Sequence, residues 1–578
     1  MQDFDIYIPQ DRRLALVRGL ALPDRTCGAA LFADISGFTP LAEALAQELG
    51  PQRGAEELTA HLNRLYDALI HCVHQFGGSV IGFSGDAITC WFNSSEGTVG
   101  TEEKKIAPVP LVPSVPVVPS LYAVACGLAM QQAMGNQSAI TTRGGATFTL
   151  AVKVAVASGP ARRFLVGDPH IQVLDVLAGH TLDQLATAGR LARRGEVVLD
   201  AQTATVIADH VHISGWRADE TAQRVAIVSG LAQQPHASVW PDTPEHNIPA
   251  KHAQGWLLPA VRERLRHHSA AFLAELRPVV ALMLHFQGID YDHDADAGQM
   301  LNSFICAAQH ITAHYEGALI DITMGDKGSY LYLTFGAPVA HDDDAARALA
   351  AARDLLALPH AMPYITAARI GLARGTMHAG AYGGTQRRTY GVLGDPANLA
   401  ARLMEAAPDG TAWCDYAVYH AAERRWVFAA LPPVRVKGKA SAVRVYEPLS
   451  ERDRHAVTSD VQQTMVGRQA EIAQLAAQLD EVVAGASRMF IIEGEAGIGK
   501  SRMVAELVQL LRARGMVGLL GAGKSVEQQT PYRAWRDIFN AYFGLDELTD
   551  AAARRARVQA YIAEHLPHLL DRAPILND

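Results

Sequence analysis

Hydrophobic and polar positions alternate in the same way in two distant parts of the chain. Residues 77–92 (GGSVIGFSGDAITCWF) and 317–335 (GALIDITMGDKGSYLYLTF) each alternate on both sides of a Gly-Asp turn, and this pattern predicts a β-hairpin. Residues 153–159 (KVAVASG) and 369–375 (RIGLARG) also match each other and predict a buried strand that ends in glycine. Because these segments occur in the same order in both parts, the sequence predicts a tandem repeat.

Each copy of the repeat opens with an apolar strand, at 29–33 in the first copy and at 279–284 in the second, and a helical segment follows. This alternation of β and α elements indicates α+β, ferredoxin-like domains. The first copy is the longer one, and its extra residues fall at about 94–120, where residues 107–120 contain five prolines. Such a proline density favours an extended polyproline segment, so we expect a surface insertion there.

Breaks in these patterns divide the chain into parts. Residues 236–255 are rich in Pro, Gly and His, which is typical of a connector, and residues 261–278 have the period of an amphipathic helix. The predicted parts are a first repeat at 1–232, a linker at 233–275, a second repeat at 276–450 and a third domain at 460–578.

The third domain begins with a different pattern. A helical segment at 468–483 precedes an apolar strand at 488–494 and the loop sequence GEAGIGKS. In this α/β context the loop is a phosphate-binding P-loop, whose lysine contacts the β- and γ-phosphates and whose serine binds Mg²⁺. The predicted residues are Gly494, Gly497, Gly499, Lys500 and Ser501. No apolar strand ending in Asp-Asp or Asp-Glu follows, so we expect only part of an NTPase domain.

Composition narrows the classes of protein that remain. Hydrophobic residues make up 49% and charged residues 19% of the chain, as in globular proteins. The net charge of −9 and the absence of long basic runs argue against nucleic-acid binding. The six cysteines lie far apart, which favours free thiols in the cytosol over disulfides or a zinc ribbon. With no apolar run of ~20 residues and no signal-peptide pattern, we expect no membrane span and a cytoplasmic location.

Two aspartates are candidates for metal binding. Asp34 ends the first apolar strand and Asp86 lies at the first hairpin turn, so neighbouring strands would present both carboxylates to divalent ions. The alternative is that Asp86 only forms the turn, which spacing alone favours. The four residues after Asp34 begin a predicted helix, whose free N–H groups suit a triphosphate or form an ordinary N-cap. They are Ser36, Gly37, Phe38 and Thr39.

A second candidate site lies in the sequence NLAAR. Asn398 and Arg402 are four residues apart and therefore project from the same face of a helix. There an amide and a guanidinium can stabilise a pentavalent phosphorus. The alternative is a solvated helix face, which is the simpler interpretation of these two residues alone.

The segments FADISGF, GFSGDA and GDPANLAARLM together resemble the catalytic domains of class III nucleotidyl cyclases. The tandem arrangement followed by a P-loop is similar to soluble adenylyl cyclases, and VGRQAEI (466–472) resembles the start of AAA or STAND ATPase modules. The resemblance implies that the two domains pair head to tail within the chain, as a pseudo-heterodimer with the site at their interface. It implies that ATP is converted to 3′,5′-cyclic AMP and pyrophosphate with two Mg²⁺ or Mn²⁺ ions, and that a further C-terminal regulatory region lies beyond this chain.

The resemblance also assigns roles to individual residues. Asp34 and Asp86 match the metal-binding aspartates, and Ile35 matches the carbonyl donor beside the first. Lys153 matches a lysine that contacts the triphosphate, Asn398 the asparagine that orients the ribose, and Arg402 the arginine that stabilises the transition state.

The second repeat departs from this pattern. His285 stands where the first repeat has Asp34, although Asp326 remains at the turn, so the resemblance implies one catalytic site and one degenerate pocket. The lysine expected to read the base falls within 321–324 (DITM), and the second base-reading position falls on Gly391. The family's architecture implies ATP as substrate and leaves GTP open. The missing base-reading residues favour the alternative function, a non-catalytic nucleotide-binding signalling module.

Overall fold

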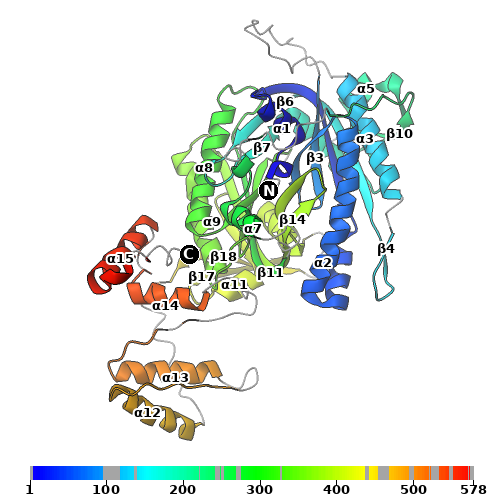
Figure 1. Ribbon diagram of the computed structural model, residues 1–578. Helices are drawn as coiled ribbons and strands as arrows, with labels where there is room; N and C mark the ends of the chain where they lie inside the picture. Colours follow the sequence, from blue (N-terminus) through cyan, green and yellow to red (C-terminus); the bar gives the residue numbers. More distant parts are fainter. Residues whose placement is uncertain are drawn as a thin grey trace. The chain divides into compact units, whose positions relative to one another are not determined.

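The computed structural model of this chain (Figure 1) describes residues 4–94, 117–135, 139–220, 222–240, 248, 253–267, 275–325, 328–436, 442–452, 468–493, 500–519, 521, 533–545, 548, 551–570 and 572. Contacts divide the chain into two units, residues 1–454 and 455–578. Both copies of the predicted repeat lie in the first unit. The limits predicted for the two repeats and the linker inside this unit stay a prediction.

The first repeat forms an eight-stranded sheet with the order β2-β3-β1-β6-β8-β10-β9, and β7 pairs with β6. Neighbouring strands are antiparallel except β6 and β8, which are parallel. Two further short strands, β4 and β5, pair with each other. The strands are β1 (Arg25–Ser36), β2 (Ser79–Ser84), β3 (Ala87–Asn93), β4 (Ala139–Thr141), β5 (Thr147–Thr149), β6 (Ala151–Val166), β7 (Leu174–Ala178), β8 (Val197–Asp200), β9 (Val211–Ala218) and β10 (Arg224–Leu231).

The second repeat forms a sheet of the same design. Its order is β12-β13-β11-β14-β16-β18-β17, and β15 pairs with β14. Only β14 and β16 are parallel, at the same place in the order as the parallel pair of the first sheet. The strands are β11 (Glu275–Gln287), β12 (Ala318–Thr323), β13 (Ser329–Phe335), β14 (Ala367–Gly383), β15 (Arg388–Leu393), β16 (Ala412–Asp415), β17 (Trp426–Val434) and β18 (Val443–Glu451). The tandem repeat and both predicted hairpins are therefore present in the described strands.

Helices cover the sheets because their apolar side chains recur every three or four residues. The long helix α2, kinked at Gly50, buries Leu62, Leu65, Tyr66 and Leu69 against the first sheet. Helices α8 and α9 bury a corresponding cluster against the second sheet. The helices of this unit are α1 (Gln10–Val17), α2 (Phe38–Gln75), α3 (Val117–Gly135), α4 (His180–Leu191), α5 (Ala201–Val206), α7 (Pro259–His267), α8 (Ala297–His314), α9 (Asp344–Ala361), α10 (Asp395–Ala406) and α11 (Tyr416–Ala422), with 3₁₀ turns η1 (Phe4–Tyr7) and η3 (Ala208–His210).

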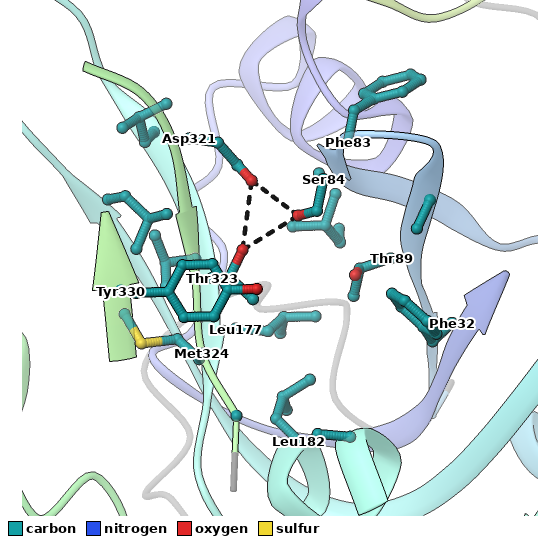
Figure 2. A pocket seen from close by; sticks show the side chains of 18 of the residues that line it. Phe32, Phe83, Ser84, Thr89, Leu177, Leu182, Asp321, Thr323, Met324 and Tyr330 are labelled. Atoms are coloured by element: carbon teal, nitrogen blue, oxygen red, sulfur yellow. Dashed lines mark hydrogen bonds between the residues drawn. The ribbon is translucent and has the colours of Figure 1, made fainter. Parts of the chain in front are cut away.

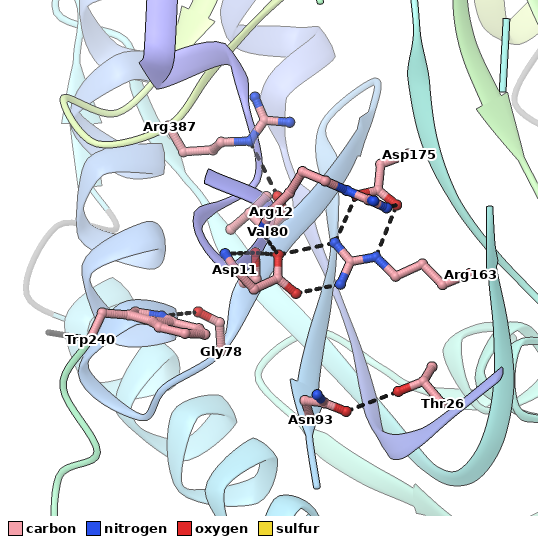
Figure 3. A network of polar contacts seen from close by, with 11 residues as sticks. Asp11, Arg12, Thr26, Gly78, Val80, Asn93, Arg163, Asp175, Trp240 and Arg387 are labelled. Atoms are coloured by element: carbon pink, nitrogen blue, oxygen red, sulfur yellow. Dashed lines mark hydrogen bonds and ion pairs between the residues drawn. The ribbon is translucent and has the colours of Figure 1, made fainter. Parts of the chain in front are cut away.

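A buried ionic network attaches the N-terminal helix α1 to the first sheet (Figure 3). Arg163 on β6 donates hydrogen bonds to Asp175 on β7 at 2.7 and 2.9 Å and also pairs with Asp11. Arg12 donates two further bonds to Asp175, both at 3.0 Å. Because each buried charge faces an opposite one, their attraction offsets part of the cost of removing these charges from water.

Three expectations from the sequence differ from the described structure. Residues 117–120 belong to α3 and not to an extended segment, because a proline in the first turn of a helix, here Pro119, loses no hydrogen bond. Of the helix predicted at 261–278, residues 261–267 belong to α7, whereas residues 275–278 belong to β11. The strands β6 and β14 continue past Gly159 and Gly375 instead of ending there. The other residues of the proline-rich insertion, 95–116, lie outside the described ones.

The second unit contains α12 (Gln469–Val483), α13 (Lys500–Ala513), α14 (Arg533–Phe543) and α15 (Ala551–His565). The helix predicted at 468–483 is present as α12. The strand predicted at 488–494 is not: residues 488–493 pair with no described strand, and Met489 and Ile491 are exposed. The P-loop glycines and the side chains of Lys500 and Ser501 lie outside the described residues. None of the helices in the described part of the chain combines the length and the apolar composition that crossing a membrane requires.

Candidate active site

Residues of both repeats line one cavity in the first unit. Its volume is about 480 Å³. From the first repeat it includes Asp34, Asp86 and Lys153, and from the second repeat Asp321 and Thr323. Three of the predicted site residues therefore share one cavity.

The register of the first sheet explains how these three side chains meet. Asp34 on β1 lies opposite Ala87 on β3 and opposite Lys153 on β6. The Lys153 Nζ is 3.0 Å from the Asp34 Oδ2, and it also donates to the Gly189 carbonyl at 3.3 Å. The Ile35 N–H donates to the Asp86 carbonyl at 3.1 Å, which ties the hairpin turn to the end of β1.

The two carboxylates lie in an electrostatic environment that suits a divalent cation. Burial and the nearby Asp34 carboxylate raise the pKa of Asp86 to about 7, and Lys153 opposes this shift. Carboxylate and carbonyl oxygens are the donors that Mg²⁺ prefers, and a cation beside both carboxylates relieves their repulsion. No group of three or more His, Cys, Asp or Glu suited to a metal occurs among the described residues. The fit to a metal therefore rests on these two carboxylates with the Ile35 carbonyl.

The residues after Asp34 form the start of α2. Ser36 ends β1 and its Oγ donates to the Ala151 carbonyl at 3.1 Å. Gly37 has φ 98°, and a Cβ there would lie 3.0 Å from the Thr149 carbonyl oxygen, so glycine is required. Phe38 and Thr39 open the helix, and their side chains lie outside the described ones.

Asn398 and Arg402 are not brought into the same cavity. Both project from α10 into a second cavity of about 580 Å³, and Asn398 is exposed. The adjacent face of α10 packs Leu399 and Leu403 into the core. Glu405, one turn beyond Arg402, lines both cavities, so the two spaces adjoin at this residue.

Sequence reasoning missed a polar contact between the repeats at the cavity wall (Figure 2). The Ser84 Oγ of β2 donates to the Asp321 Oδ2 of β12 at 2.7 Å. The Thr323 Oγ1 lies 3.2 Å from the Ser84 Oγ and 3.4 Å from the same carboxylate oxygen. Burial raises the pKa of Asp321 to about 6. The signal in the sequence is an aspartate between two apolar residues, Ile320 and Ile322.

The expected base-reading position at Gly391 is filled by another side chain. A Cβ at Gly391 would lie 2.5 Å from the Tyr382 Cε1 and 2.9 Å from its Oη. The ring of Tyr382 on β14 therefore occupies the space into which a side chain at 391 would extend. This explains in physical terms why glycine stands there.

Comparison with known proteins gives two kinds of match. Residues 464–574 match a family model described as an AAA ATPase domain. Adenylate cyclase type 10 of Oryctolagus cuniculus is 24% identical over 571 residues, which are 92% of this chain and 34% of the relative. Adenylate cyclase type 10 of Rattus norvegicus is 25% identical over 526 residues, 84% of this chain and 31% of the relative. The chain thus spans about a third of the length of these curated relatives.

Two solved structures are also similar. A class III adenylyl cyclase-like ATP-binding protein from Pseudomonas aeruginosa, 13% identical, covers 69% of this chain and 85% of its own with a TM-score of 0.46. An adenylyl cyclase from P. aeruginosa, 20% identical, covers 31% of this chain and 97% of its own with a TM-score of 0.29. The resemblance that the motifs predicted is confirmed by the sequence relatives: over most of its length this chain is similar to proteins named adenylate cyclase type 10, and it carries an AAA ATPase domain.

Proposed function

We propose that this chain is a class III adenylate cyclase that converts ATP to 3′,5′-cyclic AMP and pyrophosphate in the cavity lined by Asp34, Asp86 and Lys153. The observation that carries this proposal is the meeting of two carboxylates and an ammonium at one wall of that cavity. Hard oxygen donors suit divalent cations, and an ammonium beside them suits phosphate. A metal-bound triphosphate needs both.

The reaction requires the two repeats to pair within one chain, and two reciprocal contacts support this pairing. The Gly383 N–H at the end of β14 donates to the Asn63 Oδ1 of α2 at 3.1 Å. The Gly167 N–H after β6 donates to the Asn302 Oδ1 of α8 at 2.9 Å. In each case the connection after β6 or after β14 in one repeat contacts a long helix of the other repeat, as in a head-to-tail pair.

The first repeat would hold the reacting phosphates. Asp34, Asp86 and the Ile35 carbonyl would bind two Mg²⁺ or Mn²⁺ ions, which lower the pKa of the ribose 3′-hydroxyl and neutralise the leaving pyrophosphate. Lys153 would leave Asp34 when nucleotide binds and would contact the triphosphate instead. The N–H groups from Ser36, at the end of β1, to Thr39, in the first turn of α2, would contact the same phosphates. No protein nucleophile is needed.

The second repeat would supply Asn398 to orient the ribose and Arg402 to stabilise the transition state. These side chains line the adjoining cavity, so the proposal requires the two cavities to join at Glu405 when nucleotide binds. Catalytic contacts that are long in the free enzyme commonly form only in the complex.

GTP is a second candidate substrate, because the charged form of the Asp321 carboxylate fits guanine. A charged carboxylate accepts hydrogen bonds from the N1–H and the 2-amino group of guanine. A protonated carboxyl donates to N1 of adenine and accepts from its 6-amino group. Because the pKa of Asp321 is raised to about 6, both forms are accessible near neutral pH.

The P-loop of the AAA domain would bind a second nucleotide through Gly494, Gly497, Gly499, Lys500 and Ser501. In our proposal this second nucleotide has a regulatory role and is not the nucleotide that is cyclised. The alternative, a nucleotide-binding module without turnover, predicts binding at both places and no product.

The test is product analysis by mass spectrometry after incubation with ATP or GTP and with Mg²⁺ or Mn²⁺. We expect cyclic AMP to form faster than cyclic GMP. A preference for GTP would replace the first candidate by the second, and nucleotide binding without any cyclic product would favour the non-catalytic alternative.

A further inference from the structure

The carbonyl oxygen of Gly85 accepts hydrogen bonds from two buried tyrosines that come from different repeats. The Tyr66 hydroxyl, on α2 of the first repeat, donates to it at 3.2 Å. The Tyr382 hydroxyl, on β14 of the second repeat, donates to it at 3.4 Å. A carbonyl oxygen has two lone pairs, and these two donors use both.

Packing keeps the two hydroxyls in place. The rings of Tyr66, Phe83 and Tyr382 lie within 5.6 to 5.8 Å of one another, centroid to centroid. Tyr66 and Tyr382 are 0% and 2% exposed, and burial raises the pKa of both phenols well above the usual value, so they remain donors. Although Tyr382 belongs to the second repeat, it is part of the hydrophobic core of the first.

The position of this carbonyl determines the position of Asp86. The peptide bond between Gly85 and Asp86 is planar, so hydrogen bonds that hold the Gly85 oxygen also restrain the Asp86 nitrogen, which lies in the same plane. The Ile35 N–H holds the carbonyl of Asp86 itself at 3.1 Å. Asp86 is thus held on both sides, and Tyr382 supplies the contact that comes from the second repeat.

We propose that Tyr382 is a positioning residue that makes the divalent-cation site of the first repeat depend on its contact with the second. This inference rests on the proposed function, because it takes Asp34 and Asp86 as the cation ligands. Gly391 and Tyr382 act together in this contact. The glycine leaves room for the Tyr382 ring, and the Tyr382 hydroxyl donates to the Gly85 carbonyl.

The test uses the full 578-residue chain and two variants that disturb the hydrogen bond between Tyr382 and the Gly85 carbonyl. Tyr382→Phe removes the hydroxyl, and Gly391→Ala displaces the ring. The matched control is Tyr332→Phe, since the Tyr332 hydroxyl is also buried and also donates to a backbone carbonyl, that of Val392, at 3.0 Å. The measurements are Mn²⁺ affinity by electron paramagnetic resonance, amide hydrogen exchange of peptides covering residues 79–93, and thermal unfolding.

We expect Tyr382→Phe and Gly391→Ala each to weaken Mn²⁺ binding and to speed exchange at 79–93 by about fivefold, the effect of one lost hydrogen bond. Tyr332→Phe should lower Tm about as much as Tyr382→Phe does. It should leave the Mn²⁺ affinity and the exchange at residues 79–93 at their wild-type values. Wild-type affinity and exchange in Tyr382→Phe would overturn the proposal, and so would an equal effect of Tyr332→Phe. If Tyr382→Phe does not fold, Gly391→Ala decides by the same criteria.

The exchange measurement separates this inference from the proposed function. If the wild-type chain forms no cyclic product and binds no Mn²⁺, the proposed function fails. Exchange at residues 79–93 still reports whether Tyr382 holds the Asp86 turn, because it needs neither metal nor nucleotide.

Discussion

His285 and Arg369 lie opposite each other on β11 and β14, at the register position that Asp34 and Lys153 occupy on β1 and β6. The two repeats therefore place different chemistry on one backbone plan. The first presents a carboxylate beside an ammonium, and the second presents an imidazole beside a guanidinium. Oxygen-preferring cations suit the first arrangement and not the second, which supports one cation site in the first unit rather than two.

Arg402→Ala tests whether α10 supplies the transition-state contact. We expect kcat to fall at least ~10²-fold with little change in KM, because the contact forms mainly in the transition state. Steady-state kinetics with ATP measures both constants. A raised KM with an unchanged kcat would show that Arg402 only binds substrate. If both constants stay at their wild-type values, the second cavity has no role in turnover.

Asp321→Asn should change stability in a pH-dependent way. The pKa of Asp321 is raised to about 6 in the folded chain, above the ~3.9 of an unfolded aspartate. Its contribution to folding is therefore full below pH ~3.9 and is lost as pH rises through about 6. Thermal unfolding at pH 5 and pH 7.5 should show the variant gaining stability relative to wild type at the higher pH. An unchanged difference between the two pH values would contradict the raised pKa.

Arg163→Met should destabilise the first unit strongly. The substitution leaves the carboxylates of Asp11 and Asp175 with one cationic partner fewer in a buried place, and breaking such a network costs about 3–5 kcal/mol. Urea unfolding followed by circular dichroism measures the loss. A loss below about 1 kcal/mol, the size of an exposed ion pair, would show that water reaches the network.

Lys500→Ala tests the separation of the two nucleotide sites. The P-loop lies in the second unit and the cavity proposed for cyclisation in the first. We therefore expect cyclase rates within about twofold of wild type and a loss of ATP binding by the AAA domain. Cyclase assays and nucleotide-binding measurements on the same preparation give both values. A large fall in cyclase rate would show that the two units are coupled.

The sequence was sufficient to predict features that depend on local patterns. Alternation over a few residues predicts each hairpin. The place of Lys153 beside Asp34 follows from the strand register, which the structure gives. The contact of Ser84 with Asp321 joins residues 237 positions apart, so no local pattern contains it. Tyr382 could not be predicted from a local pattern either. Its ring explains the glycine at 391 only when the pairing of β14 with β15 is known.

Two other differences between the sequence-based predictions and the structure depend on how helices and strands pack against their neighbours. The spacing of Asn398 and Arg402 predicts a shared face, but only the packing of α10 decides which cavity that face lines. A strand needs a neighbour for its backbone hydrogen bonds, and residues 488–493 have no such partner among the described strands. For this reason an apolar run alone was not enough to predict β-structure there.

The central claim is that the carboxylates of the first repeat support cyclisation of a nucleoside triphosphate. The most direct measurement quantifies cyclic nucleotide and pyrophosphate formed from ATP and Mn²⁺ by the wild-type chain and by Asp86→Asn, with circular dichroism to show that the variant is folded. We predict equimolar cyclic AMP and pyrophosphate from the wild type and at least ~10²-fold less from the variant, which lacks a cation ligand. Equal amounts of product from both proteins, or no cyclic product from the wild type with either ATP or GTP, would contradict the claim.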